Sequence, residues 1–143
     1  MERVILAVDI GGSKYVAGLI DWQGKVLYRR KYRWNSFSVE KVITDLISAM
    51  EAVIKIAKEK IIAVGMTIPG LADSDQGIWL SSSFMGIYNL PIGSIICEHF
   101  GLPVYIENDC NACALAERMF GRCRQIENFL YLTVSNSIGG AIV

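Results

Sequence analysis

Three apolar segments follow one another within the first 34 residues, and a turn that contains glycine separates each from the next. The first, RVILAVDI, runs into Gly11-Gly12; the second is KYVAGLID; the third, KVLYRRKYRW, follows a turn at residues 22–24. Short apolar runs bounded by glycine turns are typical of strands. Because such short turns join antiparallel neighbours, the pattern predicts an antiparallel meander at the start of a sheet.

The spacing of the apolar residues then changes from one typical of strands to one typical of a helix. Apolar residues recur at helical spacing over residues 42–57, and Ser38 precedes them where it can cap a helix. Strands are next predicted for IIAVGMTIP, GIWL and PVYIE. Helices are predicted over residues 92–100 and 108–120. The apolar stripe expected on the last helix consists of Ala112, Leu115, Ala116 and Met119.

Strand–helix–strand units imply parallel pairing, whereas the meander is antiparallel. The predicted fold class is therefore α/β, with a mixed five-stranded sheet flanked by helices and formed by residues 1–125. The end of the chain, FLYLTVSNSIGGAIV, repeats the strand–glycine turn–strand pattern of its beginning. This similarity predicts a duplicated architecture, in which residues 126–143 are the first strands of a second lobe that the chain does not complete.

Composition excludes several classes of protein. Hydrophobic residues make up 52% of the 143 residues, which is enough for a sizeable core. Lys plus Arg equals Asp plus Glu at 14 each, so charge gives no reason to expect nucleic acid as a partner. Only five apolar residues precede Asp9, too few for a signal peptide or a membrane span. We therefore expect a cytoplasmic protein with reduced cysteines and no membrane partner.

The first glycine turn, DIGGSK, is a candidate phosphate-binding loop. Glycines at 11 and 12 let backbone N–H groups face an anion, and Ser13 and Lys14 add a hydroxyl and a cation. Asp9, at the end of a strand, can hold Mg²⁺ through water. The alternative is a simple hairpin turn with a solvated lysine. A strand follows the turn rather than a helix, so neither a Walker loop nor a dinucleotide fingerprint fits.

The stretch ENDCNAC joins a strand to a helix and allows two interpretations. Asp109 can cap the helix, or it can act as a general base at the carboxyl end of a strand, where ligands bind in α/β sheets. Cys110 and Cys113 form a C-x-x-C pair, which in other settings carries redox chemistry or half a zinc site. In the surrounding NACALA the cysteines stand among alanines, which favours a role as small apolar residues. In GMTIPG, Gly70 follows the end of a strand. It either forms a simple turn or lets the backbone come close to a ligand.

Together these motifs resemble the ROK family of sugar kinases and sugar-responsive repressors, which belongs to the actin-like ATPase superfamily. The resemblance rests on AVDIGGSKYVAGLID, GMTIPG, NLPI, FGLPVYIENDCNACALAE and NFLYLTVSNSIGGAIV, in the family's order. It implies one actin-like (ribonuclease H-like) lobe and the start of another. It also implies an ATP-dependent kinase that phosphorylates a hydroxyl of a hexose or N-acetylhexosamine.

The resemblance assigns roles residue by residue. The family's catalytic aspartate falls on Asp109 and its sugar-binding asparagine on Asn108, with Gly70 and Ser83 also in the substrate site. The further residues that it assigns to ATP and Mg²⁺ are Asp9, Gly11, Gly12, Ser13, Lys14, Asn136 and Gly139. The family's zinc-binding cysteines would lie in the second lobe. The chain is therefore expected to be an amino-terminal piece, inactive alone, of a protein that forms a homo-oligomer.

The chain departs from the family pattern at two loops. Ser135-Asn136-Ser137 stands where the family has Gly-Thr-Gly, the second phosphate loop, while Ser83 and Ile87 replace a usual asparagine and tryptophan near the sugar. The alternative is therefore a sugar-binding regulator or a degenerate protein without catalysis. The family's repressors carry a DNA-binding helix-turn-helix before the first loop, whereas three residues precede the strand here. This difference favours the kinase.

Overall fold

The computed structural model describes residues 2–135 and 137–143. Its elements in chain order are β1 (Arg3–Ile10), β2 (Lys14–Ile20), β3 (Val26–Arg33), α1 (Val39–Ile56), β4 (Lys60–Ile68), β5 (Leu71–Asp73), β6 (Ile78–Ser82), the 3₁₀ turn η1 (Ser83–Met85), β7 (Ile87–Leu90), α2 (Ile92–Phe100), β8 (Val104–Asn108), α3 (Asp109–Met119), β9 (Leu130–Val134) and β10 (Ile138–Ile142). None of the described helices is long and apolar enough to cross a membrane.

The main sheet has five strands in the order β3-β2-β1-β4-β8. β1 pairs antiparallel with β2, and β2 with β3, whereas β4 is parallel to both β1 and β8. The predicted mixed five-stranded sheet is therefore confirmed. Parallel pairing brings the carboxyl ends of β1, β4 and β8 to the same edge of the sheet, which is where ligands bind in open α/β sheets.

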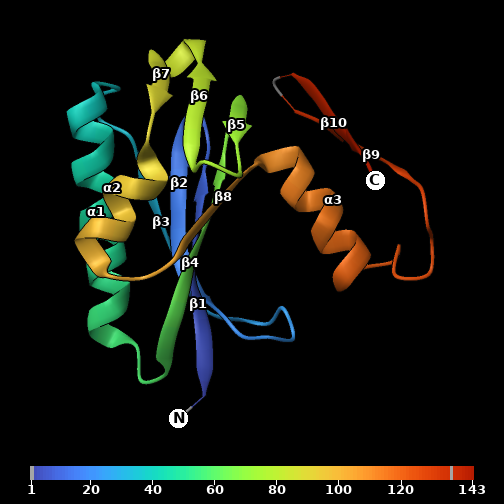
Figure 1. The fold of residues 1–143 in the computed structure, drawn as a ribbon, viewed down its shortest axis with the longest axis horizontal. Helices are drawn as coiled ribbons and strands as arrows, with labels where there is room; N and C mark the ends of the chain where they lie inside the picture. Colours follow the sequence, from blue (N-terminus) through green and yellow to red (C-terminus); the bar gives the residue numbers. More distant parts are fainter. Residues whose placement is uncertain (1, 136) are drawn as a thin grey trace.

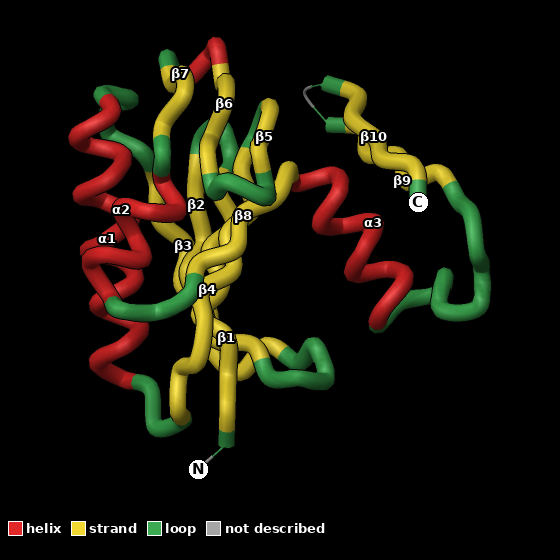
Figure 2. Tube along the Cα trace, viewed as in Figure 1, coloured by secondary structure: helices red, strands yellow, loops and turns green. Residues whose placement is uncertain are grey.

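One face of this sheet carries the hydrophobic core. Helices α1 and α2 lie on the same side of the sheet, and α3 lies on the other (Figures 1 and 2). Val4, Leu6 and Val8 alternate inward along β1, while Leu46 and Met50 face them from α1, all at most 2% exposed. Burying each such side chain stabilises the fold by roughly 1.5–3 kcal/mol. Ser38 caps α1 as predicted, because its hydroxyl accepts the Lys41 N–H.

A small three-stranded sheet, β5-β6-β7, stands beside the main one. The sequence pattern predicted only β6, because β5 has three residues and β7 has four, too few to show a period. Trp79 of β6 is fully buried, and its indole N–H donates to the Pro69 carbonyl at 3.0 Å. This bond ties the small sheet to the loop that follows β4.

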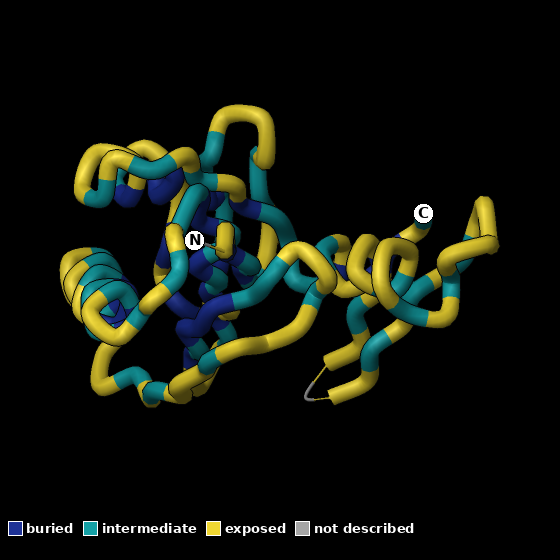
Figure 3. The backbone as a smooth tube through the Cα atoms, turned by 90° about the horizontal axis from the view of Figure 1, so that it is seen from below, coloured by how far each residue is buried: buried dark blue, intermediate teal, exposed yellow. Residues whose placement is uncertain are grey.

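Helix α3 packs on the β9–β10 hairpin, and the apolar stripe predicted for it is wrong. Cys110 and Ala114 are the buried residues of α3 and form a small cluster with Ala141 of β10. Two members of the predicted stripe, Leu115 and Met119, are 47% and 64% exposed. Two small side chains, Cys110 and Ala114, face the hairpin, whereas the other two members of the predicted stripe, Ala112 and Ala116, line the cavity beside the main sheet. Much of this part of the chain is exposed, in contrast to the main core (Figure 3).

Candidate functional site

Three polar residues lie in a row across the carboxyl ends of the parallel strands. In the register of the sheet, Asp9 of β1 is opposite Thr67 of β4, and Thr67 is opposite Glu107 of β8. The Thr67 hydroxyl donates to Oδ1 of Asp9 at 2.6 Å. A single sheet edge therefore presents two carboxylates and a hydroxyl from segments up to 98 residues apart.

Asp9 meets the requirements of a magnesium site. Its side chain is exposed, and Thr67 holds one of its two oxygens in place. Mg²⁺ in phosphate-transferring proteins keeps most of its waters and needs only one or two carboxylates beside the phosphates. Within residues 2–135 and 137–143, no three His, Cys, Asp or Glu side chains gather into a complete metal cage. An exposed carboxylate beside the glycine turn at residues 11–14 is therefore the kind of donor that fits this ion.

The turn after β1 has the geometry of a tight hairpin. The Gly11 N–H donates to the Lys14 carbonyl at 2.9 Å, and the Gly11 carbonyl accepts the indole N–H of Trp34 at 2.9 Å. Gly12, Ser13 and Lys14 are exposed. A β-carbon on Gly12 would lie 2.9 Å from the ring of Phe84. The Phe84 side chain of the η1 turn thus lies directly against the Gly12 backbone, and a larger residue at 12 would have to displace its ring.

Asn108 joins two loops of the site. Its Nδ2 donates to the Gly70 carbonyl at 2.7 Å, and its Oδ1 accepts the N–H groups of Cys110 and Asn111. Gly70 has φ +93°, and a β-carbon there would collide with the Ser81 carbonyl. Only glycine allows this backbone conformation and this close approach. The loop after β4 is thereby fixed against both the small sheet and the start of α3.

The N-cap of α3 is Asn108, which corrects the prediction that Asp109 caps this helix. Asn108 has the extended backbone of a cap (φ −59°, ψ 143°) and satisfies two free N–H groups. Asp109 is the first helical residue, and its Oδ1 accepts the Cys110 N–H at 2.9 Å. In the hydrogen bonds of the described residues, Oδ2 of Asp109 takes no part. This oxygen remains available to a ligand.

Glu107, which the resemblance includes in the ENDCNAC motif, is a hydrogen-bonding centre of the site. Its Oε1 accepts the Asn108 N–H at 2.8 Å and the Asn111 side-chain amide at 3.1 Å. Its Oε2 accepts the Ser74 hydroxyl at 3.0 Å. One carboxylate thus connects β8, the first turn of α3 and the turn between β5 and β6. Through these bonds Glu107 holds the Asn108 backbone and the Asn111 side chain, which lie on either side of Asp109 in the sequence.

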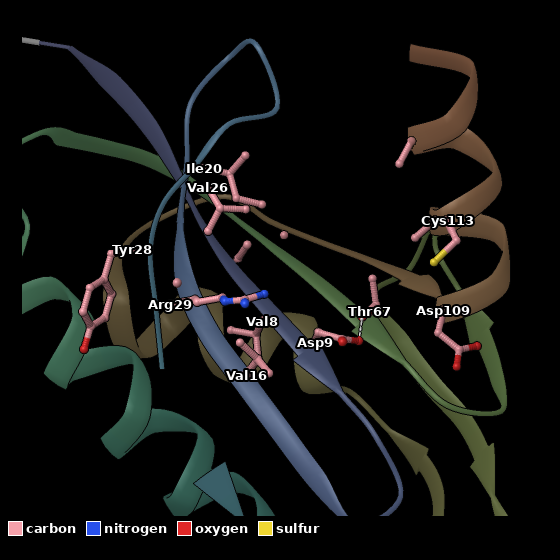
Figure 4. A pocket seen from close by; sticks show the side chains of 15 residues that line it. Val8, Asp9, Val16, Ile20, Val26, Tyr28, Arg29, Thr67, Asp109 and Cys113 are labelled. Carbon is pink, nitrogen blue, oxygen red and sulfur yellow. Dashed lines mark hydrogen bonds between the residues drawn. The ribbon is translucent and has the colours of Figure 1, made fainter. Parts of the chain in front are cut away.

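A cavity of about 400 Å³ lies between the open face of the sheet and α3. Asp9 and Thr67 line it from the sheet, and Asp109 and Cys113 from the helix (Figure 4). Arg29 of β3 extends over the same sheet face. The predicted base and the predicted magnesium ligand therefore border one space, although 100 residues separate them in the sequence.

The two cysteines of the C-x-x-C pair form no disulfide, and among the described residues they do not join a group of three His, Cys, Asp or Glu side chains. Cys110 is buried and Cys113 exposed, and both are free thiols. Burial, followed by the nearby Asp109 carboxylate, raises the pKa of Cys110 above its usual value. A hydrogen bond with the Cys113 thiol, followed by the charge of its thiolate form, raises the pKa of Tyr131. His99, another residue type that can bind metal, lies near the end of α2, where its Nε2 is 3.1 Å from Oε1 of Glu51.

The remaining predicted residues lie on the η1 turn and on the β9–β10 hairpin. Ser83 begins the exposed η1 turn beside Phe84. Gly139 lies in β10, where a β-carbon would be 2.7 Å from Sγ of Cys110, so this glycine permits close packing on α3. The Ser135 N–H donates to the Ser137 carbonyl at 2.9 Å across the turn between the two strands. Asn136 lies outside the described residues.

Comparisons with known sequences agree with this geometry. The profile of the ROK family matches residues 5–143. The chain is 32% identical over 142 residues to a glucokinase of Thermotoga maritima, covering 97% of this chain and 44% of that protein. It is 29% identical over 143 residues to a xylose repressor of Caldicellulosiruptor bescii, covering 97% of this chain and 36% of that protein. The chain thus spans less than half the length of either relative.

The fold also matches a solved structure. A ROK family glucokinase from Streptomyces griseus, in complex with glucose and AMPPNP, superposes with a TM-score of 0.88 at 27% identity. The alignment covers 98% of this chain and 44% of that one. The expected actin-like ATPase fold is therefore confirmed for this part of the molecule.

Proposed function

Because this chain belongs to the ROK family, we propose that it supplies the sugar-binding and first phosphate-binding half of an ATP-dependent sugar kinase. The acceptor is a hydroxyl of a hexose or N-acetylhexosamine. The relatives of the chain include sugar kinases and also repressors, so membership of the family alone does not decide between them. The site residues favour the kinase.

In the proposed reaction, Asp109 is the general base. Its free Oδ2 takes the proton of the attacking sugar hydroxyl while that oxygen forms a bond to the γ-phosphorus of ATP. The bond between the γ-phosphorus and the bridging oxygen breaks, and ADP leaves. Asn108 and Ser83 orient the sugar, and the backbone of the turn at residues 11–14 faces the phosphates. Mg²⁺, when bound near Asp9, neutralises phosphate charge.

One observation carries the proposal: Asp9 and Asp109 border the same cavity, and each has one oxygen fixed by a protein donor. Phosphoryl transfer needs a carboxylate for the proton and another for the ion beside the phosphates. A hydrogen bond to one oxygen of a carboxylate orients its second oxygen, and the carboxylate keeps its negative charge. A pair of solvated surface carboxylates would not have this arrangement.

The proposal extends to the organisation of the whole protein. Residues 1–125 form the amino-terminal lobe, and residues 126–143 begin a second lobe that would contribute Asn136 and Gly139 to the ATP site. The protein acts in the cytoplasm, binds sugar and ATP rather than nucleic acid or membrane, and forms a homo-oligomer. A structural zinc ion would belong to the second lobe.

The second candidate is a sugar-binding regulator without catalysis. The similarity to a xylose repressor and the serines at 135 and 137 support it. A side chain at these positions crowds a backbone that must approach phosphate. Such a regulator would keep the sugar site, including Asn108, and lose ATP turnover.

The test uses the full-length natural protein and measures its sugar-dependent release of ADP from MgATP. The sugars are a panel of hexoses and N-acetylhexosamines. Sugar binding is measured in parallel by calorimetry without nucleotide. The proposal expects at least one sugar that both binds and stimulates ADP release. Binding without any ADP release would favour the regulator, and the absence of both would reject the two candidates together.

A further inference from the structure

We infer that Phe84 is a further residue of the sugar site, and that its ring is an apolar platform for the C–H face of a pyranose. The inference rests on the proposed function and deepens it. Neither the sequence motifs nor the family resemblance assigned this residue a role. It follows from the position of the η1 turn relative to the phosphate loop.

Phe84 lies on top of the phosphate loop. An added β-carbon at Gly12 would be 2.9 and 3.2 Å from two ring carbons of Phe84, so the ring edge already fills the space above the Gly12 backbone. The ring is nevertheless 56% exposed. A large aromatic side chain that is supported on one side and open on the other is suited to contact a ligand.

A continuous series of contacts connects this ring to the proposed base. Ser83 precedes Phe84 in the turn, and β6, which ends at Ser82, lies against Gly70. The Gly70 carbonyl accepts from Asn108, the residue before Asp109. On the other side, Gly12 lies three residues after Asp9. These contacts link the η1 turn that carries Phe84 to the proposed sugar residues on one side and to the proposed phosphate loop on the other.

This position matches the chemistry of a sugar. Small-molecule sites are largely apolar and aromatic, with a few polar groups that fix orientation. Phe84 provides apolar area, while Ser83 and Asn108 provide hydrogen-bonding groups at its margin. A pyranose has C–H groups on its faces and hydroxyls at its rim, so it can use both. A ligand without an apolar face would not gain from the ring.

The test measures binding of D-glucose and N-acetyl-D-glucosamine by calorimetry, without nucleotide, to the protein as its organism makes it. Phe84→Ala should weaken binding of the preferred sugar about tenfold, the upper range for loss of an aromatic contact. Phe84→Trp should keep binding within about threefold, because the platform remains. Trp22→Ala is the matched control: Trp22 is 63% exposed in the β2–β3 turn, at the opposite end of the strands, and its loss should leave binding unchanged.

Gly12→Ala provides a second arm that separates this role from general damage. The new methyl group must displace the Phe84 ring, so Gly12→Ala alone should weaken sugar binding. The double variant Gly12→Ala, Phe84→Ala should bind sugar no more weakly than Phe84→Ala alone, because the ring is already absent. Equal sugar affinity in wild type and Phe84→Ala would overturn the inference and leave the proposed function intact. If the wild type binds neither these sugars nor any other of the panel, the proposed function itself fails and the inference with it.

Discussion

At the scale of single residues, the hydrogen bond between Thr67 and Asp9 determines which carboxylate oxygen of Asp9 is free for a ligand. The bond is 2.6 Å long and uses Oδ1 of Asp9, which leaves Oδ2 for water on an ion. Groups that orient a metal ligand in this way commonly change metal affinity when they are removed. In the proposed magnesium site, Thr67 would therefore act as a positioning residue and not as a ligand.

Thr67→Val tests this role because valine has the shape of threonine without the hydroxyl. We expect the apparent affinity for Mg²⁺ in the ADP-release assay to fall about tenfold, while sugar affinity without nucleotide stays the same. Thr67→Ser, which keeps the hydroxyl, should retain most of the wild-type affinity. An unchanged Mg²⁺ requirement in Thr67→Val would mean that the bond is only structural.

The positions of the candidate site residues were predictable to an uneven extent. Asp9, Asn108 and Asp109 stand in recognisable motifs, and the structure places all three at the same sheet edge. Thr67 was not identified, because only the parallel register of β1 and β4 brings it opposite Asp9. The cap of α3 was misassigned, because Asn and Asp cap almost equally well and the sequence does not say which of the two has the extended backbone.

At the scale of elements, Glu107 connects three segments that carry the site. It accepts from Ser74 in the turn after β5, from the Asn108 backbone at the end of β8, and from Asn111 in α3. Each neutral donor to a charged acceptor contributes more than an ordinary hydrogen bond. The orientation of α3 relative to the small sheet depends on this carboxylate.

Glu107→Ala should lower the free energy of unfolding by about 1–3 kcal/mol, because three donors lose their acceptor at a half-buried position. Sugar affinity should fall as well, because the Asn108 backbone loses the bond from its N–H that helps to position this residue. Ser74→Ala removes one donor and keeps the other two bonds, so its effect should be smaller in both measurements. Urea unfolding and calorimetry provide the values, and wild-type sugar affinity in Glu107→Ala would reject the orienting role.

The long elements were predictable, whereas the short ones were not. β1, β2 and α1 have enough residues to show a period of 2 or 3.6, and their bounds agree with expectation to within a few residues. β5, β7 and η1 have three or four residues each, too few to show a period, and β5 and β7 are strands through their tertiary pairing with β6. The stripe on α3 was misjudged because small residues bury well only where the partner comes close.

At the scale of the whole molecule, one face of the β9–β10 hairpin is apolar and exposed. Five aliphatic side chains are between 59% and 86% exposed: Leu130, Leu132, Val134, Ile138 and Ile142. Cross-strand partners such as Val134 and Ile138 make this face continuous. An exposed apolar face next to free strand edges favours association.

The 143-residue chain, expressed by itself, should therefore self-associate. Light scattering after size exclusion should show a mass above that of one chain at high concentration. Leu132→Lys together with Ile138→Lys places charge on the hairpin face and should shift the protein toward the monomer. A strictly monomeric wild-type chain at millimolar concentration would be inconsistent with this expectation.

The architecture as a whole was predictable from the order of its elements, and the family resemblance is confirmed. The cavity was not predictable, since it depends on how far α3 stands from the sheet. Tertiary contacts hold α3 in place: Asn108 at its start donates to the Gly70 carbonyl, and Cys110 packs on Gly139 of the hairpin. Sequence periodicity identifies which face of an element is apolar, but it does not say which neighbour that face will meet.

The central claim is that Asp109 is a base and not a cap. Because Asn108 caps α3, Asp109→Asn should change the free energy of unfolding by less than about 1 kcal/mol, and Asp109→Ala should leave the cap in place as well. Both changes remove a useful proton acceptor. Asp75→Asn, at an exposed turn carboxylate, serves as the matched control.

The decisive measurement is kcat for ADP release by Asp109→Asn, on the sugar that the wild type accepts, beside a thermal melt. The account predicts a fall of roughly 100-fold or more, the usual scale for loss of a general base, with an unchanged melt and normal turnover in Asp75→Asn. Normal turnover in Asp109→Asn would contradict it, because an amide cannot accept the sugar's proton.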